Sequence, residues 1–193
     1  LEWLALGRHY RMPARLVDFT YSFYVSLYFA ISEIENNVDG WIVAFNLSWN
    51  KADVELKLKT QWSHWNVPAN RAAFQDAELF KQFAFVHAIE YVVAVNPLRR
   101  NPRLAAQQGL FLCPGNIERT FDDNVNTTVG KTPNVKRLIR LPPGIRKDAW
   151  DALRIMNINS ASLFRDLSGW AESQRDVVHR DIPDDRFKQE LEL

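Results

Sequence analysis

Side chains that can do chemistry gather in residues 9–22, directly ahead of an apolar stretch that ends at Ile34. Alternation along an extended strand places Asp18 and Thr20 on one face, where a carboxylate and a hydroxyl can act together. The strand leads into the N-terminus of a helix, where free backbone N–H groups and the helix field favour a phosphate. We therefore predict that this junction holds a pyrophosphate. The catalytic residues are expected to be Asp18 and, much later in the chain, Gln108. The ligand-binding side chains are expected to be His9, Tyr10, Arg15, Thr20 and Ser22.

The same residues also have a purely structural explanation. Arg15 and Asp18 can form an internal ion pair that fixes the entry to the strand, and such pairs are common although they seldom stabilise a fold strongly. His9 and Tyr10 would then anchor the loop by hydrogen bonds. The spacing of these residues does not separate the two explanations, and both stay open at this point.

A second polar cluster, Gln107-Gln108-Gly109, lies much later in the chain. Paired amides offer donors and acceptors together, so Gln107 and Gln108 can orient a ribose or the edge of a base. The structural alternative is a turn in which Gly109 takes a positive φ and the glutamines bind backbone groups. We expect this turn to meet the segment of residues 9–22 around a common hollow.

Positive charge is concentrated in the middle of the chain. The net charge is only +1, yet residues 97–147 carry ten Lys and Arg against three Asp and Glu. Such a basic segment can face a nucleic acid or another phosphate-rich ligand, and we predict that Arg99, Arg100 and Arg103 make these contacts. The alternative is a set of solvated arginines on loops and edge strands.

Other kinds of site are not indicated. The four histidines are scattered without the spacing of metal ligands and no glycine-rich phosphate loop is present, so we predict no metal site. The single cysteine, Cys113, cannot form an internal disulfide, which favours a reducing compartment; we expect the cytoplasm. The longest apolar stretch, Phe23 to Ile34, is too short to span a membrane. Because the chain opens at Leu1 without a methionine, we expect an upstream segment of the same protein to complete the fold.

The elements that position these residues follow from patterning. With 193 residues, 47% of them hydrophobic, the chain can bury one sizeable core, so we predict a single domain over residues 1–180 and a polar tail, 181–193. The mixture of strand and helix patterns predicts an α+β fold with a central mixed β-sheet and surrounding helices. Strands are expected near residues 15–20, 41–47 (a central strand), 88–95, 110–112 and 135–141. Helices are expected over 21–34, 73–83, 104–108, 145–158 and 166–178; Ser22 can cap the first of them, and either Asp166 or Ser168 the last. Irregular structure is expected over 48–73 and an exposed loop over 114–134.

Three blocks of the sequence resemble the FRG domain family. His9 to Ala30 is similar to its His-Tyr-Gly, Pro-Thr-Arg-Leu-Leu-Asp-Trp-Thr and Ala-Leu-Tyr-Phe-Ala signature, and residues 101–111 and 162–169 resemble two later blocks in the same order. The Phe/Tyr-Arg-Gly motif of the family normally lies upstream of His9. The resemblance implies a bacterial or phage-type protein of mixed α and β structure in a family without a settled activity. The chain departs from the pattern at Arg11, Ala14, Phe19 and Phe23, where Gly, Thr, Trp and Pro are typical.

The leading functional hypothesis is a nucleotide-using enzyme, most concretely one that uses NAD like an ADP-ribosyltransferase. The order of features is similar to that class: an upstream Arg, hydroxyls at a strand-to-helix junction, and a late Gln or Glu. Gln108 stands where Glu is usual, and since an amide cannot serve as a carboxylate, Asp18 would have to supply the acid. The alternatives are a nucleic-acid or phosphate-ligand binding module that uses the basic segment, and a non-catalytic interaction domain.

Overall fold

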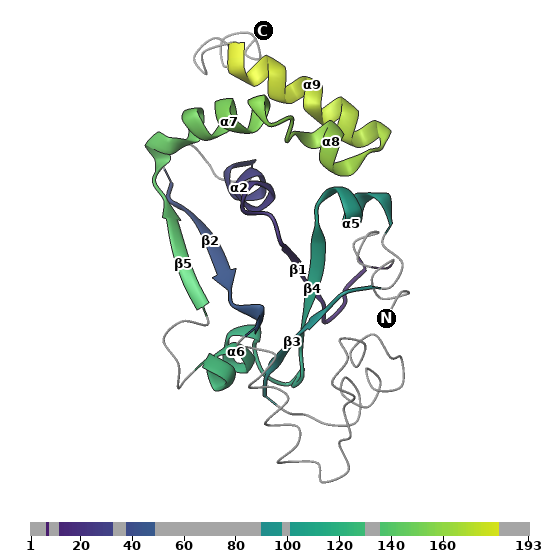
Figure 1. Ribbon diagram of the computed structural model, residues 1–193, viewed down its shortest axis with the longest axis vertical. Helices are drawn as coiled ribbons and strands as arrows, with labels where there is room; N and C mark the ends of the chain where they lie inside the picture. Colours follow the sequence, from purple (N-terminus) through teal and green to yellow (C-terminus); the bar gives the residue numbers. More distant parts are fainter. Residues whose placement is uncertain are drawn as a thin grey trace, which may run out of the picture.

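The computed structural model describes residues 7, 12–32, 38–48, 90–97, 101–129 and 136–181, with the side chains of 127–129 and 175–181 left out. Helices and antiparallel strands alternate along these segments, which confirms the expected α+β class (Figure 1). No helix in these segments is both long and apolar enough to cross a membrane. The expected helix over 73–83 and, apart from Ser48, the irregular region over 48–73 lie outside the described residues.

A three-stranded antiparallel sheet joins segments that are far apart in the sequence. Its order is β1 (Val17–Thr20), β4 (Gly109–Pro114) and β3 (Val92–Val95), so the strands expected near 15–20, 88–95 and 110–112 are confirmed. Thr20 is paired with Gly109, and Val95 with Phe111. The end of β1, the start of β4 and the end of β3 therefore lie together. We call this place the sheet end and define it by residues 20–22, 96 and 107–109.

A separate two-stranded sheet contains β2 (Gly40–Phe45) and β5 (Lys136–Leu141), which pair antiparallel. Both strands were expected, but the prediction that residues 41–47 form the central strand of one mixed sheet is wrong. The described strands form two sheets, and every pairing in them is antiparallel. Alternation of apolar residues shows that a segment is extended, whereas the choice of its partner depends on packing between distant segments.

Helix α2 (Phe23–Ser32) lies at the centre of the larger hydrophobic core. Val25, Leu27, Tyr28 and Ile31 are buried, and they pack with Ile42 and Leu141 of the small sheet and Leu153 of α7 (Arg146–Ile155). The Tyr28 and Trp150 rings meet edge to face at 5.5 Å between centroids. The expected burial of this helix on several sides is only partly correct, because its N-terminal turn extends past the core: Tyr21 is 52% exposed, and Phe23 and Tyr24 are also exposed.

The C-terminal helices form the outer layer above α2 (Figure 1). Helix α7 follows a 3-10 turn, η2 (Pro143–Ile145), and the chain continues through α8 (Ser160–Phe164) into α9 (Leu167–Asp181). The Asp166 carboxylate accepts a hydrogen bond of 2.7 Å from the Gly169 N–H, so the predicted cap is confirmed. Helix α5 (Pro102–Ala106), capped by Asn101, begins two residues before the turn predicted over 104–108. It lies beside α8.

Helix α6 (Phe121–Val129) occupies part of the region that was expected to be an exposed loop, so that prediction is wrong. The Asp123 N–H donates to the Thr120 hydroxyl at 3.1 Å, and the Thr120 N–H donates to the Asp123 carboxylate at 3.3 Å. This reciprocal pair is a capping box, which fixes the helix start. Val125 is fully buried and packs against Val92 and Leu112 of the three-stranded sheet. The polar composition of this segment therefore led to a wrong prediction, because α6 buries only a narrow part of its surface, around Asn124 and Val125.

Candidate functional site

The sheet end brings the early polar segment against the double-glutamine turn. The Thr20 hydroxyl donates a hydrogen bond of 2.7 Å to the Gln107 carbonyl, and the Tyr21 N–H donates to the Gln108 carbonyl at 3.0 Å. These bonds continue the pairing of β1 with β4 beyond the last ladder pair. The two segments that were expected to meet are adjacent, and they meet through the backbone of the glutamines.

The two hydroxyls at the sheet end have different roles. Thr20 has a single proton, which goes to the Gln107 carbonyl, and its oxygen accepts from the Ser22 N–H at 3.0 Å. Thr20 therefore orders the junction and has no proton left for a ligand. The Ser22 oxygen caps α2 by accepting from the Val25 N–H at 3.3 Å. A serine hydroxyl that accepts in this way keeps its own proton for another acceptor.

The turn before β4 differs from the structural alternative considered above. Gln108, and not Gly109, has the positive φ, 48°. Gly109 suits its position for a different reason: a Cβ on this residue would overlap Cδ1 of Leu104 and would lie 3.3 Å from the Leu104 carbonyl oxygen. The Gln108 side chain is exposed to solvent.

The Gln107 side chain contains a buried donor. Its Nε2 atom is excluded from solvent and has no hydrogen-bond partner in the described part of the chain. A buried amide that lacks a partner costs about 1–3 kcal/mol. The sheet end therefore contains a polar group whose hydrogen-bonding capacity is not used.

A third strand reaches the sheet end through Asn96, which follows β3. The Asn96 amide donates to the Tyr21 hydroxyl at 2.9 Å, and its carbonyl oxygen lies 3.3 Å from the same hydroxyl. The rings of Phe23 and Tyr24 lie beside this bridge in sequence and meet edge to face at 5.7 Å. The sequence did not indicate Tyr21 or Asn96 as site residues. They are 75 positions apart, and no local pattern predicts their hydrogen bond.

Asp18 and Arg15 lie on or next to β1. Asp18 is exposed, is paired across the ladder with Phe111, and shares its face of the strand with Thr20. Burial raises the pKa of the Cys113 thiol to about 12, and the nearby Arg15 guanidinium partly lowers it. Arg15 therefore faces a buried thiol of β4. His9 and Tyr10 lie outside the described residues.

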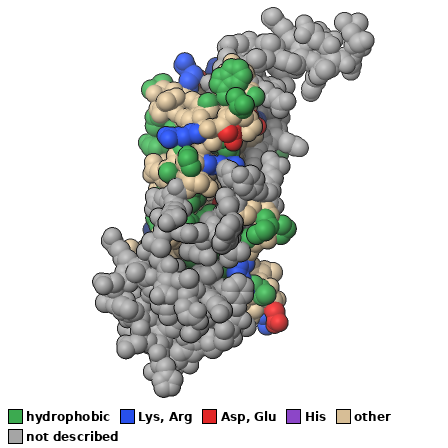
Figure 2. Space-filling model, turned by 90° about the vertical axis from the view of Figure 1, so that its right-hand side faces the viewer, with side chains coloured by type: hydrophobic (Ala, Val, Ile, Leu, Met, Phe, Trp, Pro, Cys, Tyr) green, Lys and Arg blue, Asp and Glu red, His purple; other side chains and the backbone are tan. Residues whose placement is uncertain are grey.

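The predicted basic segment is divided between two sides of the molecule. The Arg103 guanidinium on α5 lies 4.5 Å from the centre of the Phe164 ring. On β5, which lies on the opposite side in Figure 1, Lys136 contacts Asp122 at 3.1 Å. The described part of the face in Figure 2 shows Lys and Arg side chains singly among apolar ones. Arg99 and Arg100 lie outside the described residues.

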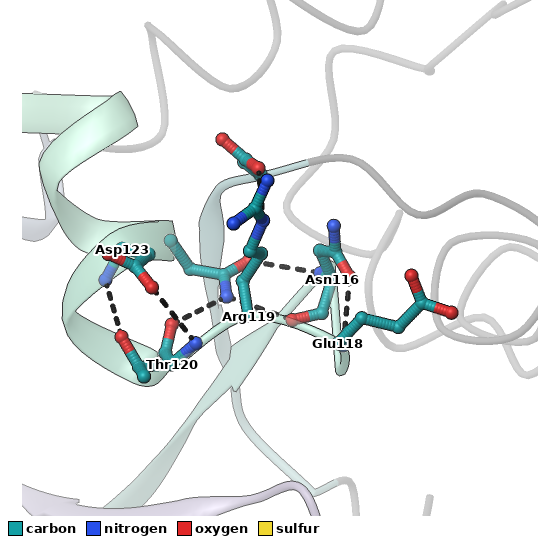
Figure 3. Close-up of polar contacts among 7 residues, drawn as sticks. Asn116, Glu118, Arg119, Thr120 and Asp123 are labelled. Carbon is teal, nitrogen blue, oxygen red and sulfur yellow. Dashed lines mark hydrogen bonds and ion pairs between the residues drawn. The ribbon is translucent and has the colours of Figure 1, made fainter.

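A second polar region, which the sequence did not reveal, lies at the other end of the three-stranded sheet (Figure 3). The Asn124 side chain is fully buried; it donates to the Asn116 carbonyl at 2.9 Å and to the Thr120 carbonyl at 2.8 Å, and it accepts from the Asn116 N–H at 3.0 Å. These bonds hold the loop between β4 and α6, from which Arg119 reaches Glu90 at 3.2 Å. An open hollow of about 430 Å³ is lined by Glu90, Arg119, Asp123 and Asn126. In the described residues no group of acidic, His or Cys side chains is arranged to hold a metal ion.

Comparison with known families gives one match. The family model of the FRG domain matches residues 1–39, which include the first of the three blocks noted in the sequence. No curated protein and no solved structure matches the chain. The matched segment contains β1, the junction and α2, and thus the early half of the sheet end.

Proposed function

We propose that the sheet end binds a nucleotide and that the protein is an enzyme that uses it. The observation that carries this proposal is the buried Gln107 Nε2, which has no partner among the described residues. Its cost is offset if a shift of the neighbouring side chains admits a ligand whose oxygen or ring nitrogen accepts the hydrogen. The Asn96 amide, which supplies both a donor and an acceptor, lies at the same end of the sheet.

The neighbouring aromatic side chains suit the base of a nucleotide. Tyr21 and Tyr24 are about half exposed at the start of α2. Stacking of a nucleobase on an exposed aromatic ring contributes about 1–3 kcal/mol per base to the binding free energy. Stacking on a ring and hydrogen bonds from carboxamides together recognise a base without any charged group.

The start of α2 suits the phosphates. Its first turn contains no acidic residue, so the positive end of the helix dipole is not neutralised there. The Ser22 hydroxyl caps the helix as an acceptor and retains its proton, which can be donated to a phosphate oxygen.

The chemistry that we propose is transfer of ADP-ribose from NAD. The bond between the ribose C1′ and the nicotinamide nitrogen breaks, the acceptor nucleophile bonds to C1′, and its proton passes to the Asp18 carboxylate. Asp18 shares a strand face with Thr20, two residues from the junction. The exposed Gln108 carboxamide has the role of orienting the ribose hydroxyls.

Isothermal titration with NAD, ADP and a single-stranded oligonucleotide tests the binding step. We expect heat with NAD, and at least tenfold weaker affinity in Gln107→Met, since Met keeps the side-chain volume and removes the amide. Gln174→Met, on the exposed surface of α9, is the matched control and should bind as the unchanged protein does. Absence of heat with both nucleotides would refute the proposal, and heat with the oligonucleotide alone would point to the basic segment instead.

NAD consumption tests the chemical step. We expect Asp18→Asn to bind NAD normally and to lose at least a hundredfold in turnover, because the amide cannot accept the proton. Its melting temperature should stay within a few degrees of the unchanged protein, since Asp18 is exposed. A large drop in melting temperature would instead assign Asp18 a structural role.

A further inference from the structure

The small sheet has one buried face and one exposed apolar face. Ile42 and Leu141 point into the core. On the other face, Trp41 is 53% exposed and Leu138 is 58% exposed, and Val43, the ladder partner of Leu138, is exposed beside them. Side chains alternate along each strand, so these three residues share one side of the sheet.

One edge of this sheet has no neighbouring strand among the described residues. In the part of the chain that the structure describes, β5 has a single hydrogen-bonded neighbour, β2. Figure 1 shows β5 at the periphery, with β2 between it and the rest of the molecule. The outer edge of such a strand presents backbone N–H and C=O groups that can pair with an extended segment.

The charges on this edge select the kind of segment that would pair with it. β5 contains Lys136, Arg137 and Arg140, whereas β2 contains no charged residue. Lys136 and Arg140 contact Asp122 and Asp39 in exposed ion pairs. A single exposed contact such as Lys136–Asp122 contributes about 0–1 kcal/mol, so a partner carboxylate can replace Asp122 at little cost. Arg140 holds Asp39 through two hydrogen bonds and would share its charge with the partner.

We propose that β5 binds an extended segment of a partner protein in which acidic and apolar residues alternate. The backbone of the segment would add a strand to the sheet. Side chains alternate along β5, so Lys136, Leu138 and Arg140 share one face of the sheet, and Ile139 lies on the other. The acidic side chains of the segment would lie beside Lys136 and Arg140, and its apolar side chains would lie on the opposite face, beside Ile139. A second copy of this chain is a poorer occupant, because two copies of β5 would set Lys and Arg against each other.

A labelled peptide of seven residues that alternates valine and glutamate, capped at both ends, tests this proposal by fluorescence anisotropy. We expect binding that weakens with added salt, and at least tenfold weaker binding in Leu138→Glu, because the new carboxylate repels the peptide. Ile155→Glu is the control, since Ile155 is 81% exposed on α7 and lies away from β5. It should bind as the unchanged protein does.

Two further measurements separate strand addition from simple charge attraction. N-methylation of alternate peptide residues removes the N–H donors of one peptide edge without changing charge, and we expect one of the two alternate sets to abolish binding. A valine–lysine peptide should not bind. The proposal is overturned if the acidic peptide does not bind, if Leu138→Glu binds it equally well, if neither methylated set matters, or if sedimentation shows that a second copy of the chain occupies this edge.

Discussion

The hydroxyl of Thr20 donates a hydrogen bond of 2.7 Å to the backbone carbonyl of Gln107, a residue 87 positions later in the chain. The same oxygen accepts from the Ser22 N–H, so one side chain connects the end of β1, the start of α2 and the turn before β4. These bonds join residues 20–22 to the glutamine turn at residues 107–109.

Replacement of Thr20 by valine tests this connection. Valine keeps the shape and removes both hydrogen bonds, so we expect the free energy of unfolding to fall by about 1–3 kcal/mol. Urea denaturation followed by circular dichroism measures the change. Thr20→Ser keeps the hydroxyl and should lose clearly less; equal losses in the two variants would show that the methyl group, and not the hydroxyl, matters.

Opposite effects are expected at the two neighbouring positions of the glutamine turn. Gln108 has a positive φ, so Gln108→Gly relieves strain and should raise the free energy of unfolding by up to about 1 kcal/mol. Gly109→Ala should lower it by about 1–3 kcal/mol, because the new Cβ meets Leu104. The double variant Gly109→Ala with Leu104→Ala shows whether this contact is the cause. In the Leu104→Ala background, Gly109→Ala should lower the free energy of unfolding by a smaller amount. Destabilisation by Gln108→Gly would contradict the assignment of the strained residue.

Asn124 is expected to be the polar residue most sensitive to substitution on α6. Asn124→Ala removes three hydrogen bonds to the loop and leaves buried backbone groups of Asn116 without partners. We expect a loss of about 2–4 kcal/mol in thermal or urea unfolding. Asn126→Ala, on the exposed side of the same helix, serves as the comparison and should stay within about 0.5 kcal/mol. Similar effects of the two substitutions would mean that the buried network contributes little.

The Cys113 thiol predicts a stability change at alkaline pH. Burial raises its pKa to about 12 in the folded protein, whereas an unfolded thiol titrates near about 8.5. The folded pKa is the higher one, so its contribution is fully present below about pH 8.5 and is lost as the pH rises toward 12. Cys113→Ala should flatten this part of the stability curve, measured as melting temperature against pH.

Tyr91 provides a background in the same experiment, since burial raises the pKa of its phenol as well. That contribution is common to the unchanged protein and Cys113→Ala, so the difference between the two curves isolates the thiol. A difference that does not depend on pH between 8 and 11 would exclude the thiol as the titrating group. At pH 8 the native thiol should also react with Ellman's reagent only at the rate of unfolding.

Several elements could be predicted because their signals are local. Helix α7 follows from apolar residues at helical spacing, and the Asp166 cap and the turn around Gln107 follow from a few neighbouring residues. Helix α6 has an equally local signal, the Thr120–Asp123 capping box, but its polar composition led to the prediction of a loop. That error came from weighing composition above the capping pattern.

The sequence by itself indicated most of the described strands and helices, though not α6 or α8, because caps, turns and alternation act over a few residues. It also marked residues 1–39 as similar to the FRG domain. Only the tertiary structure decided that there are two sheets among the described strands, that the Thr20 proton is used by Gln107, and that Tyr21 pairs with Asn96. Such choices depend on which buried surfaces fit together. The two hydrogen bonds join residues 87 and 75 positions apart, and no pattern along the chain records them.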